Sequence, residues 1–127
     1  VQAPCLRPNG QTSAEFIRAI KEKYPDQLVM ADCDNIENAL ACAGLVRTLS
    51  ADERGYTPET TGINDVDFGF IAQLARECPA KVIAEANPTP EQAVQALYAG
   101  AFALVVGGAI TAGGITARYT AAINNHK

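Results

Sequence analysis

Residues 81–111 read KVIAEANPTPEQAVQALYAGAFALVVGGAIT, which is the pattern of a strand, a helix and a second strand. The apolar run 82–84 ends in an acid, Glu85, and the apolar run 102–106 ends in two glycines. Parallel strands joined by a helix finish at the same edge of their sheet. One strand therefore brings a carboxylate to this edge, and the other brings bare backbone that an anion can approach. The unit favours a phosphorylated ligand.

An earlier stretch of the chain repeats this pattern. The apolar run 28–31 is followed by Asp32 and then by a helix predicted to stop at Gly44, just as the later helix is predicted to stop at Gly100. An acid at the end of a buried strand costs desolvation free energy. It is useful at the carboxyl edge of the sheet, where (β/α) barrels gather their active sites. The repeat indicates two acids at one edge.

Local signals predict the other elements. Thr12 with Glu15 and Asp34 with Glu37 form capping boxes, and Asp65 caps a further helix. The first helix, which Pro25 ends, is expected to bury a stripe made of Phe16, Ile17, Ile20 and Tyr24. The helix after Asp65 is expected to bury a stripe made of Phe68, Ile71, Ala75 and Cys78. A strand is predicted at 45–49, and a last helix carries Ile115, Tyr119 and Ile123. The alternation predicts an α/β fold with a parallel sheet and right-handed crossovers.

The composition excludes several classes of protein. The 127 residues suit one domain, and 48% hydrophobic with 19% charged residues is typical of globular proteins. A net charge of −4 without a basic stretch argues against a nucleic-acid partner. No apolar run approaches the roughly 20 residues of a membrane span, and the first residues lack the pattern of a signal peptide. We therefore expect a cytoplasmic protein without a membrane partner.

The cysteines and the histidine limit the kinds of catalytic and metal site that the chain can form. The four cysteines contain no Cys-x-x-Cys pair and are expected to be reduced core thiols: Cys5, Cys33, Cys42 and Cys78. His126, next to the last residue, is the one histidine of the sequence. A Ser-His-Asp triad, a Cys-His dyad or a histidine-based zinc site cannot be built from internal residues. We expect no metal, and the available chemistry is that of carboxylates, lysines, arginines and backbone amides.

Several separated motifs resemble one enzyme family. They are LVMADCDNIENALACAG, TLS followed by GYT, VIAEANPTPEQA and LVVGGAIT. Together they resemble the C-terminal half of the N-acetylmannosamine-6-phosphate 2-epimerase (N-acylglucosamine-6-phosphate 2-epimerase) family, over nearly the whole chain. The resemblance implies half of a (β/α)8 TIM barrel, with four parallel strands alternating with helices in a single half-barrel domain, residues 1–127.

The family reaction is a proton transfer. It inverts the carbon beside a carbonyl and converts N-acetylmannosamine 6-phosphate to N-acetylglucosamine 6-phosphate in sialic-acid catabolism, without a metal or nucleotide. The resemblance implies that Glu85 is the acid-base residue and that Asp32 and Tyr56 contact the sugar. The amides of Gly107 and Gly108 would bind phosphate, with Gly108 in place of the family's serine.

The sequence also departs from the family pattern. Ala86 and Asn87 replace a glycine and a basic residue of the phosphate site, and residues 51–54 are an insertion. The family's catalytic lysine, and a glutamine and an arginine that hold the substrate, lie on its first three strands, which this chain does not contain. We therefore expect a truncated or diverged relative that is inactive alone.

Two other functions remain open. The chain is alternatively a non-catalytic module that binds a sugar phosphate or small anion, or an assembly remnant without a ligand. In these cases Glu85 is a solvated acid at a strand end and the glycine pair is a tight turn. Lys81 begins its strand and is expected to be a surface charge, whereas Arg47 should pair with an acid or reach solvent.

A sheet of four strands cannot close on itself. It leaves two unpaired edges and an apolar face in water. We therefore expect a homodimer in which each copy presents its last strand to the first strand of the other. The result would be a closed eight-stranded barrel or a related sandwich.

Overall fold

The structure, a computed structural model, describes residues 2–3, 10–33, 35–52, 66–86, 88–107, 110 and 116–125. Strands and helices alternate along the chain. The strands are β1 (Gln2–Ala3), β2 (Met30–Cys33), β3 (Thr48–Asp52), β4 (Lys81–Ala86) and β5 (Ala103–Val106). The helices are α1 (Ser13–Lys23), α2 (Ile36–Ala43), α4 (Phe68–Glu77), α5 (Pro90–Tyr98) and α7 (Thr116–Asn124).

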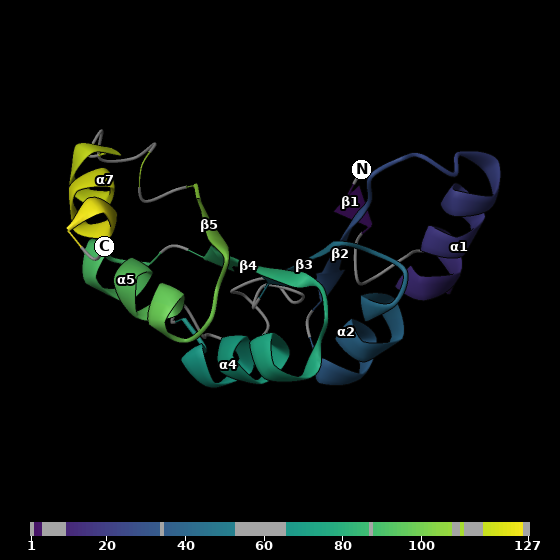
Figure 1. The fold of residues 1–127 in the computed structure, drawn as a ribbon, viewed down its shortest axis with the longest axis horizontal. Helices are drawn as coiled ribbons and strands as arrows, with labels where there is room; N and C mark the ends of the chain where they lie inside the picture. Colours follow the sequence, from purple (N-terminus) through teal and green to yellow (C-terminus); the bar gives the residue numbers. More distant parts are fainter. Residues whose placement is uncertain are drawn as a thin grey trace.

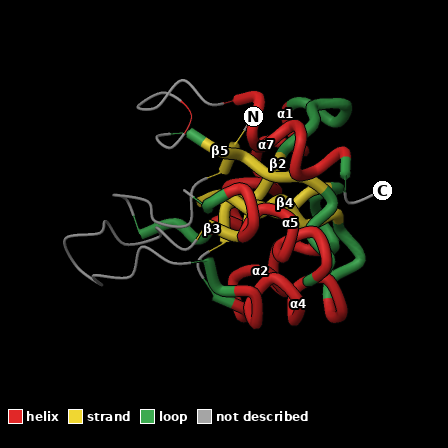
Figure 2. The backbone as a smooth tube through the Cα atoms, turned by 90° about the vertical axis from the view of Figure 1, so that its left-hand side faces the viewer, coloured by secondary structure: helices red, strands yellow, loops and turns green. Residues whose placement is uncertain are grey.

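The strands form one parallel sheet whose spatial order follows the chain, β1-β2-β3-β4-β5. Right-handed crossovers that always advance in the same direction place every connecting helix on the same face of the sheet. Figure 1 shows the helices around the outer side of a curved sheet, and Figure 2, seen at right angles, shows α2 and α4 packed against the strands. The predicted parallel α/β class is confirmed. The two-residue strand β1 adds a fifth strand beside the predicted four.

The two faces of the sheet have different surroundings. Side chains alternate between them along each strand. Ala31, Leu49 and Val82, paired across three strands, are at most 2% exposed and belong to the core between sheet and helices. On the other side, which we call the open face, Val105 of β5 is 42% exposed. No described helix covers the open face.

Two strands begin later than predicted. β2 covers Met30–Cys33 instead of 28–31, and Leu28 is 67% exposed. The predicted run was chosen for its apolar content, but backbone pairing with the neighbouring strand decides where β2 lies. Asp32 is consequently inside the strand, in register with Ser50, and not beyond its end.

β3 is displaced in the same direction. It covers Thr48–Asp52 instead of 45–49. Leu45 donates its backbone N–H to the carbonyl oxygen of Cys42 in the turn after α2, so this apolar residue belongs to the connection. β4 contains the whole predicted run 82–84 and also Glu85, which lies near the carboxyl end of the strand, as expected. β5 begins one residue after the predicted start.

The helix starts combine confirmed and wrong predictions. Thr12 and Glu15 form the predicted capping box, with bonds of 2.9 and 3.2 Å between backbone N–H and side-chain oxygen. α2 is capped instead by Asn35, whose side chain accepts the N–H of Asn38 at 2.8 Å. The predicted cap, Asp34, lies outside the described residues.

The start of α4 also differs from the prediction. Asp67 caps this helix by accepting the N–H of Phe70 at 2.9 Å, whereas the predicted cap, Asp65, lies outside the described residues. Thr89 caps α5, with a reciprocal bond between Gln92 and the Thr89 N–H. Pro90 follows as the first helical residue, where its missing N–H costs nothing.

The buried stripes follow the predicted spacing with two corrections. In α1, Ile17 is fully buried, but Tyr24 caps the helix and is 55% exposed. In α4, Ile71 and Leu74 are buried, whereas Ala75 is exposed. Tyr119 is the buried residue of α7, as its position in the predicted last helix indicated. Ile115 lies outside the described residues.

Candidate functional site

Glu85 lies on the open face, at the carboxyl end of β4. Its partner positions in the sheet are Asp52 on β3 and Val105 on β5. The Ser50 hydroxyl donates a hydrogen bond of 3.1 Å to Glu85 Oε2. Ser50 is completely buried while the Glu85 side chain is half-buried, so one carboxylate oxygen is held by the sheet and the residue still reaches the surface. This is the arrangement expected of an oriented acid-base group.

Asp32 lies on the same face, two strands away. It is in register with Ser50, which is in register with Ile83, two residues before Glu85. Strand spacing and rise place the Asp32 and Glu85 backbones roughly 10–12 Å apart. Asp32 is 8% exposed. The sheet therefore brings both predicted acids to one face, with Ser50 on the strand between them.

Gly107 follows the last residue of β5, so it stands at the same carboxyl edge as Glu85. Its carbonyl oxygen accepts the N–H of Ile110 at 3.0 Å. A methyl group at this position would meet no atom within 4 Å, and the residue has no positive φ. The described fold therefore does not require glycine here. Its partner Gly108, and also Tyr56 and Asn87, lie outside the described residues.

Two residues that were not predicted to belong to the site support this edge. Ser50 holds Glu85, and Tyr119 of α7 donates its hydroxyl to the carbonyl oxygen of Pro88 at 2.6 Å. Pro88 belongs to the segment between β4 and α5, three residues after Glu85. The alternation of Thr48 and Ser50 with apolar neighbours is the sequence signal that indicates a polar open face in β3. The link from Tyr119 to Pro88 has no local signal.

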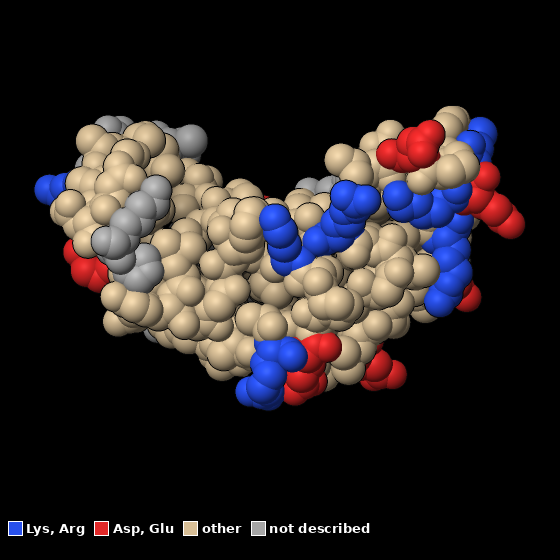
Figure 3. Space-filling model, viewed as in Figure 1, with Lys and Arg blue, Asp and Glu red and all other residues tan. Residues whose placement is uncertain are grey.

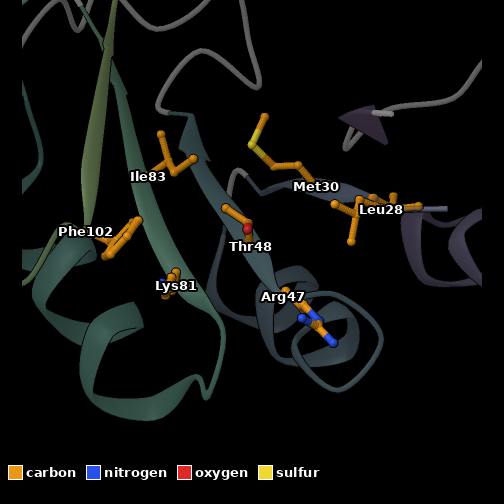
Figure 4. A pocket seen from close by; sticks show the side chains of 8 residues that line it. Leu28, Met30, Arg47, Thr48, Lys81, Ile83 and Phe102 are labelled. Atoms are coloured by element: carbon orange, nitrogen blue, oxygen red, sulfur yellow. The ribbon is translucent and has the colours of Figure 1, made fainter. Parts of the chain in front are cut away.

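The opposite, amino end of the open face has a different chemistry. A cavity of 610 Å³ lies there, and Figure 4 shows side chains from three strands and their flanks around it. Lys81, the first residue of β4, is exposed, as predicted for a surface charge. Arg47 precedes β3 and is exposed. It was predicted either to pair with an acid or to reach solvent, and it reaches solvent. The cations and the acids therefore lie at opposite ends of the face.

The described cysteines, Cys33, Cys42 and Cys78, are buried free thiols. A hydrogen bond with Cys33 is the main reason that the pKa of Cys42 lies below its ordinary value, and burial raises the pKa of Cys78. Cys33 and Cys42 pack in the core on the helix side of the sheet, away from the two acids. Within the described ranges, no three His, Cys, Asp or Glu side chains are placed to hold a metal ion, and no helix is long and apolar enough to cross a membrane.

A parallel sheet wound in one direction, with helices on one face and carboxylates at the carboxyl end of the other, is the architecture of the (β/α)-barrel class of folds. The family model described as "Putative N-acetylmannosamine-6-phosphate epimerase" matches residues 4–125. The chain belongs to this N-acetylmannosamine-6-phosphate epimerase family.

Relatives with the corresponding 2-epimerase name support this assignment. The protein from Lactiplantibacillus plantarum is 41% identical over 83% of the chain and 48% of its own length, and that from Caldanaerobacter subterraneus is 43% identical over 83% and 45%. The chain thus spans about half the length of these relatives.

Two solved structures share the fold. The N-acetylmannosamine-6-phosphate 2-epimerase from Clostridium perfringens has a TM-score of 0.68 and 36% identity, and the match covers 91% of this chain and 51% of that one. Thiamine phosphate pyrophosphorylase from Pyrococcus furiosus has a TM-score of 0.71 at 18% identity, over 99% and 59% of the two chains. The second likeness concerns the fold alone.

Proposed function

We propose that these 127 residues carry the acid-bearing part of an N-acetylmannosamine-6-phosphate 2-epimerase site. The observation that carries the proposal is the Glu85 carboxylate, which stands at the carboxyl end of β4 and is fixed through one oxygen by Ser50. Membership of the epimerase family supports the choice of an amino-sugar phosphate as the ligand.

Each residue has a separate task in this proposal. Glu85 exchanges a proton with the carbon beside the sugar's carbonyl, and Asp32 and Tyr56 contact the sugar. Gly107 and Gly108 present backbone amides to the phosphate. The empty space around the Gly107 Cα is consistent with this task, because a phosphate oxygen can approach the backbone there. No metal or other cofactor takes part.

By itself the chain should give little or no epimerisation. Inversion of a carbon requires proton transfer on both faces, and one fixed carboxylate serves one face. The resemblance assigns the opposing lysine to family strands that these residues do not match. Lys81 is no substitute, because it begins β4 and Glu85 stands near the end of the same strand.

Solvent deuterium exchange tests this proposal. The chain is incubated with N-acetylmannosamine 6-phosphate in D₂O, and NMR follows both deuterium at the second carbon and the appearance of the epimer. We expect no interconversion. Interconversion by the wild-type chain that is lost in Glu85→Gln would overturn the expectation of inactivity and establish a complete enzyme.

Ligand binding separates the remaining alternatives. A binding module is stabilised against heat by N-acetylmannosamine 6-phosphate but not by the unphosphorylated sugar. The effect should weaken in Gly107→Val, because its side chain fills the space in front of the backbone, while the fold tolerates the change. A chain that no phosphosugar stabilises would be an assembly remnant, which contradicts the proposed site.

We also propose that the chain alone is a cytoplasmic homodimer. The open face favours pairing with a second copy, and so do the outer edges of β1 and β5, beside which no further strand lies among the described residues. The free thiols of the described cysteines are in keeping with a reducing compartment. Light scattering measures the mass directly, and a stable monomer at micromolar concentration would exclude the dimer.

A further inference from the structure

Two cysteine thiols meet in the core on the helix side of the sheet. Cys33 is the last residue of β2, and Cys42 is the last residue but one of α2, the helix that packs against this strand. Both side chains are completely buried in the same apolar cluster. A hydrogen bond joins the two thiols, so their sulfur atoms are direct neighbours. The fold thus brings together two reactive groups from different elements.

Neighbouring groups orient each thiol. The Cys33 thiol donates to the carbonyl oxygen of Ala31 at 3.8 Å, and the Cys42 thiol donates to Asn38 Oδ1, one turn earlier on α2, at 3.8 Å. The side-chain amide of Asn38 donates in turn to the carbonyl oxygen of Asp32 at 3.5 Å. A thiol is a weak hydrogen-bond donor, so these bonds orient the sulfur atoms but cost little to break.

Cys42 has the chemistry of a nucleophilic thiol. Its pKa lies below the ordinary value, chiefly because of the hydrogen bond with Cys33, although burial acts in the opposite direction. Arg18 of α1 attracts the same negative charge. Figure 3, in the view of Figure 1, shows basic side chains over α1. Because the thiolate and not the thiol reacts with oxidants, Cys42 is expected to react first.

Cys78 provides a contrast within the same chain. It follows α4 and is also buried, with 7% of its surface exposed. Its pKa is raised, first by burial and second by the charge of Glu77. Burial by itself therefore keeps a cysteine of this fold protonated and inert. The contact between two thiols is what distinguishes Cys33 and Cys42.

We propose that Cys33 and Cys42 form a redox-active dithiol, which a hydroperoxide converts to a disulfide that ties α2 to β2. This modification site goes beyond the proposed function and does not depend on the task of Glu85 or on a sugar ligand. The hydroperoxide is the two-electron oxidant, and no metal takes part.

The oxidation proceeds in two steps. The Cys42 thiolate attacks one oxygen of hydrogen peroxide, the O–O bond breaks, and Cys42 becomes a sulfenic acid while the leaving hydroxide takes up the proton that Cys42 released. Cys33 then attacks the Cys42 sulfur, the S–O bond breaks, and the Cys33 proton leaves with the hydroxide as a second water. The two thiols lose two protons and two electrons, and the peroxide is reduced to two waters.

The position of the pair sets how the oxidation occurs and what it changes. Both sulfur atoms are buried, so hydrogen peroxide, a small neutral molecule, reaches them when the short helix α2 opens locally. The disulfide draws the sulfurs from hydrogen-bond distance to about 2.05 Å and pulls α2 toward β2. It also removes the thiol proton that Cys42 donates to Asn38, which is bonded to the Asp32 backbone.

Peptide mapping after peroxide treatment tests the proposal. The reduced chain is treated with millimolar hydrogen peroxide without denaturant, and the remaining thiols are then blocked with N-ethylmaleimide in urea. Cys33 and Cys42 lie in one tryptic peptide, residues 24–47. We expect this peptide to lose about 2 Da and to carry no maleimide, while Cys78 still takes the label. A pair that stays reduced, or a chain in which Cys78 reacts first, would overturn the proposal.

Three serine variants assign the roles. Cys33→Ser should leave a sulfenic acid on Cys42 that dimedone labels, because the second thiol is missing. Cys42→Ser should leave Cys33 unlabelled at the same peroxide dose, and the matched control Cys78→Ser should form the disulfide as the wild-type chain does. Equal labelling of Cys33 and Cys42 in the two single variants would refute Cys42 as the nucleophile. The wild-type peptide map decides the disulfide even where a variant fails to fold.

Denaturant separates a property of the fold from closeness in sequence. In urea the two thiols lose their contact, so the lead of Cys42 over Cys78 in its reaction with peroxide should disappear. An equal lead in the native and the unfolded chain would contradict the proposal. Since no phosphosugar is present, neither result bears on the site around Glu85, and failure of that site leaves the dithiol intact.

Discussion

The unit of β2 with α2 and the unit of β4 with α5 have the same sequence pattern but different surroundings. Each strand has an acid as its penultimate residue, Asp32 or Glu85, and each helix is followed closely by a glycine. Asp32 is 8% exposed inside the sheet, whereas Glu85 is half-buried and bonded to Ser50. Neighbouring strands, and not the repeated pattern, decide how each acid is presented.

The helix ends differ in the same way. Gly44 has φ −79°, a right-handed value open to any residue, and a side chain there would meet no atom within 4 Å. Gly100 has φ +108°, and a methyl group would lie 2.6 Å from the Ala75 side chain. The first glycine is therefore dispensable, and the second is required both by its backbone and by the close approach of α4.

Replacement of these glycines is the strongest test of the comparison. Gly100→Ala should lower the free energy of unfolding by about 2–4 kcal/mol, because it combines an unfavourable φ with a clash. Gly44→Ala should leave it unchanged or raise it by up to about 1 kcal/mol, because alanine restricts the unfolded chain. Urea denaturation of both variants measures the difference.

A double variant separates the two causes. Gly100→Ala with Ala75→Gly removes the methyl group that causes the clash but leaves the positive φ. Partial recovery of stability is expected. Full recovery would mean that the backbone conformation contributes nothing, and no recovery would mean that contact with α4 is irrelevant.

A smaller effect on stability is expected from removing the hydrogen bond between Ser50 and Glu85. Ser50→Ala removes a buried donor to a carboxylate and should cost about 1–2 kcal/mol of stability. Thr48→Val, two residues earlier on the same face, keeps the side-chain volume and should cost under about 0.5 kcal/mol. Similar losses in both variants would show that the bond between Ser50 and Glu85 does not stabilise the sheet. Chemical denaturation at constant pH provides the measurement.

The smallest effect concerns the start of α5. The pKa of the Glu91 carboxyl lies below its ordinary value of 4.5. The main cause is a hydrogen bond with the backbone N–H of Glu91 itself, and the second cause is a hydrogen bond with the Thr89 hydroxyl. A lowered folded-state pKa means that the ionised form is favoured by folding. Its contribution is therefore present above about pH 4.5 and is lost as the pH falls through the folded-state value.

Acid titration of stability checks this prediction. Glu91→Gln should lower the stability slightly at pH 7, where the ionised carboxyl contributes, and should remove part of the stability loss between pH 5 and pH 3 (roughly the range of carboxyl titration). An acid-unfolding profile identical to that of the wild-type chain would contradict the prediction. The matched control is Glu37→Gln, which makes the same change in the first turn of α2.

The elements could be predicted from the sequence because their signals are local. The capping box of Thr12 and Glu15, the end of α1 before Pro25 and the order of strands and helices all follow from neighbouring residues. Strand limits are not local. The apolar residues Leu28 and Leu45 precede their strands, because register with the adjacent strands sets where β2 and β3 begin.

The candidate site could be predicted only in part, for the same reason. Glu85 and Asp32 were found because acids that end apolar runs are conspicuous in the sequence. Ser50 was not, because its bond to Glu85 joins residues 35 positions apart and requires the register of β3 with β4. The cation pair of Arg47 and Lys81 likewise forms only when two strands lie side by side.

The hydrogen bond from Tyr119 to Pro88 also has a spectroscopic consequence. The chain contains no tryptophan, so its near-ultraviolet absorption and fluorescence come from tyrosine. Tyr24 and Tyr98 are 55% and 74% exposed, whereas Tyr119 is buried with its phenol on a carbonyl oxygen. Rearrangement of the segment after Glu85 would change the environment of this one buried, described ring. Tyr119 is thus an intrinsic optical reporter of events beside the acid, available without any label.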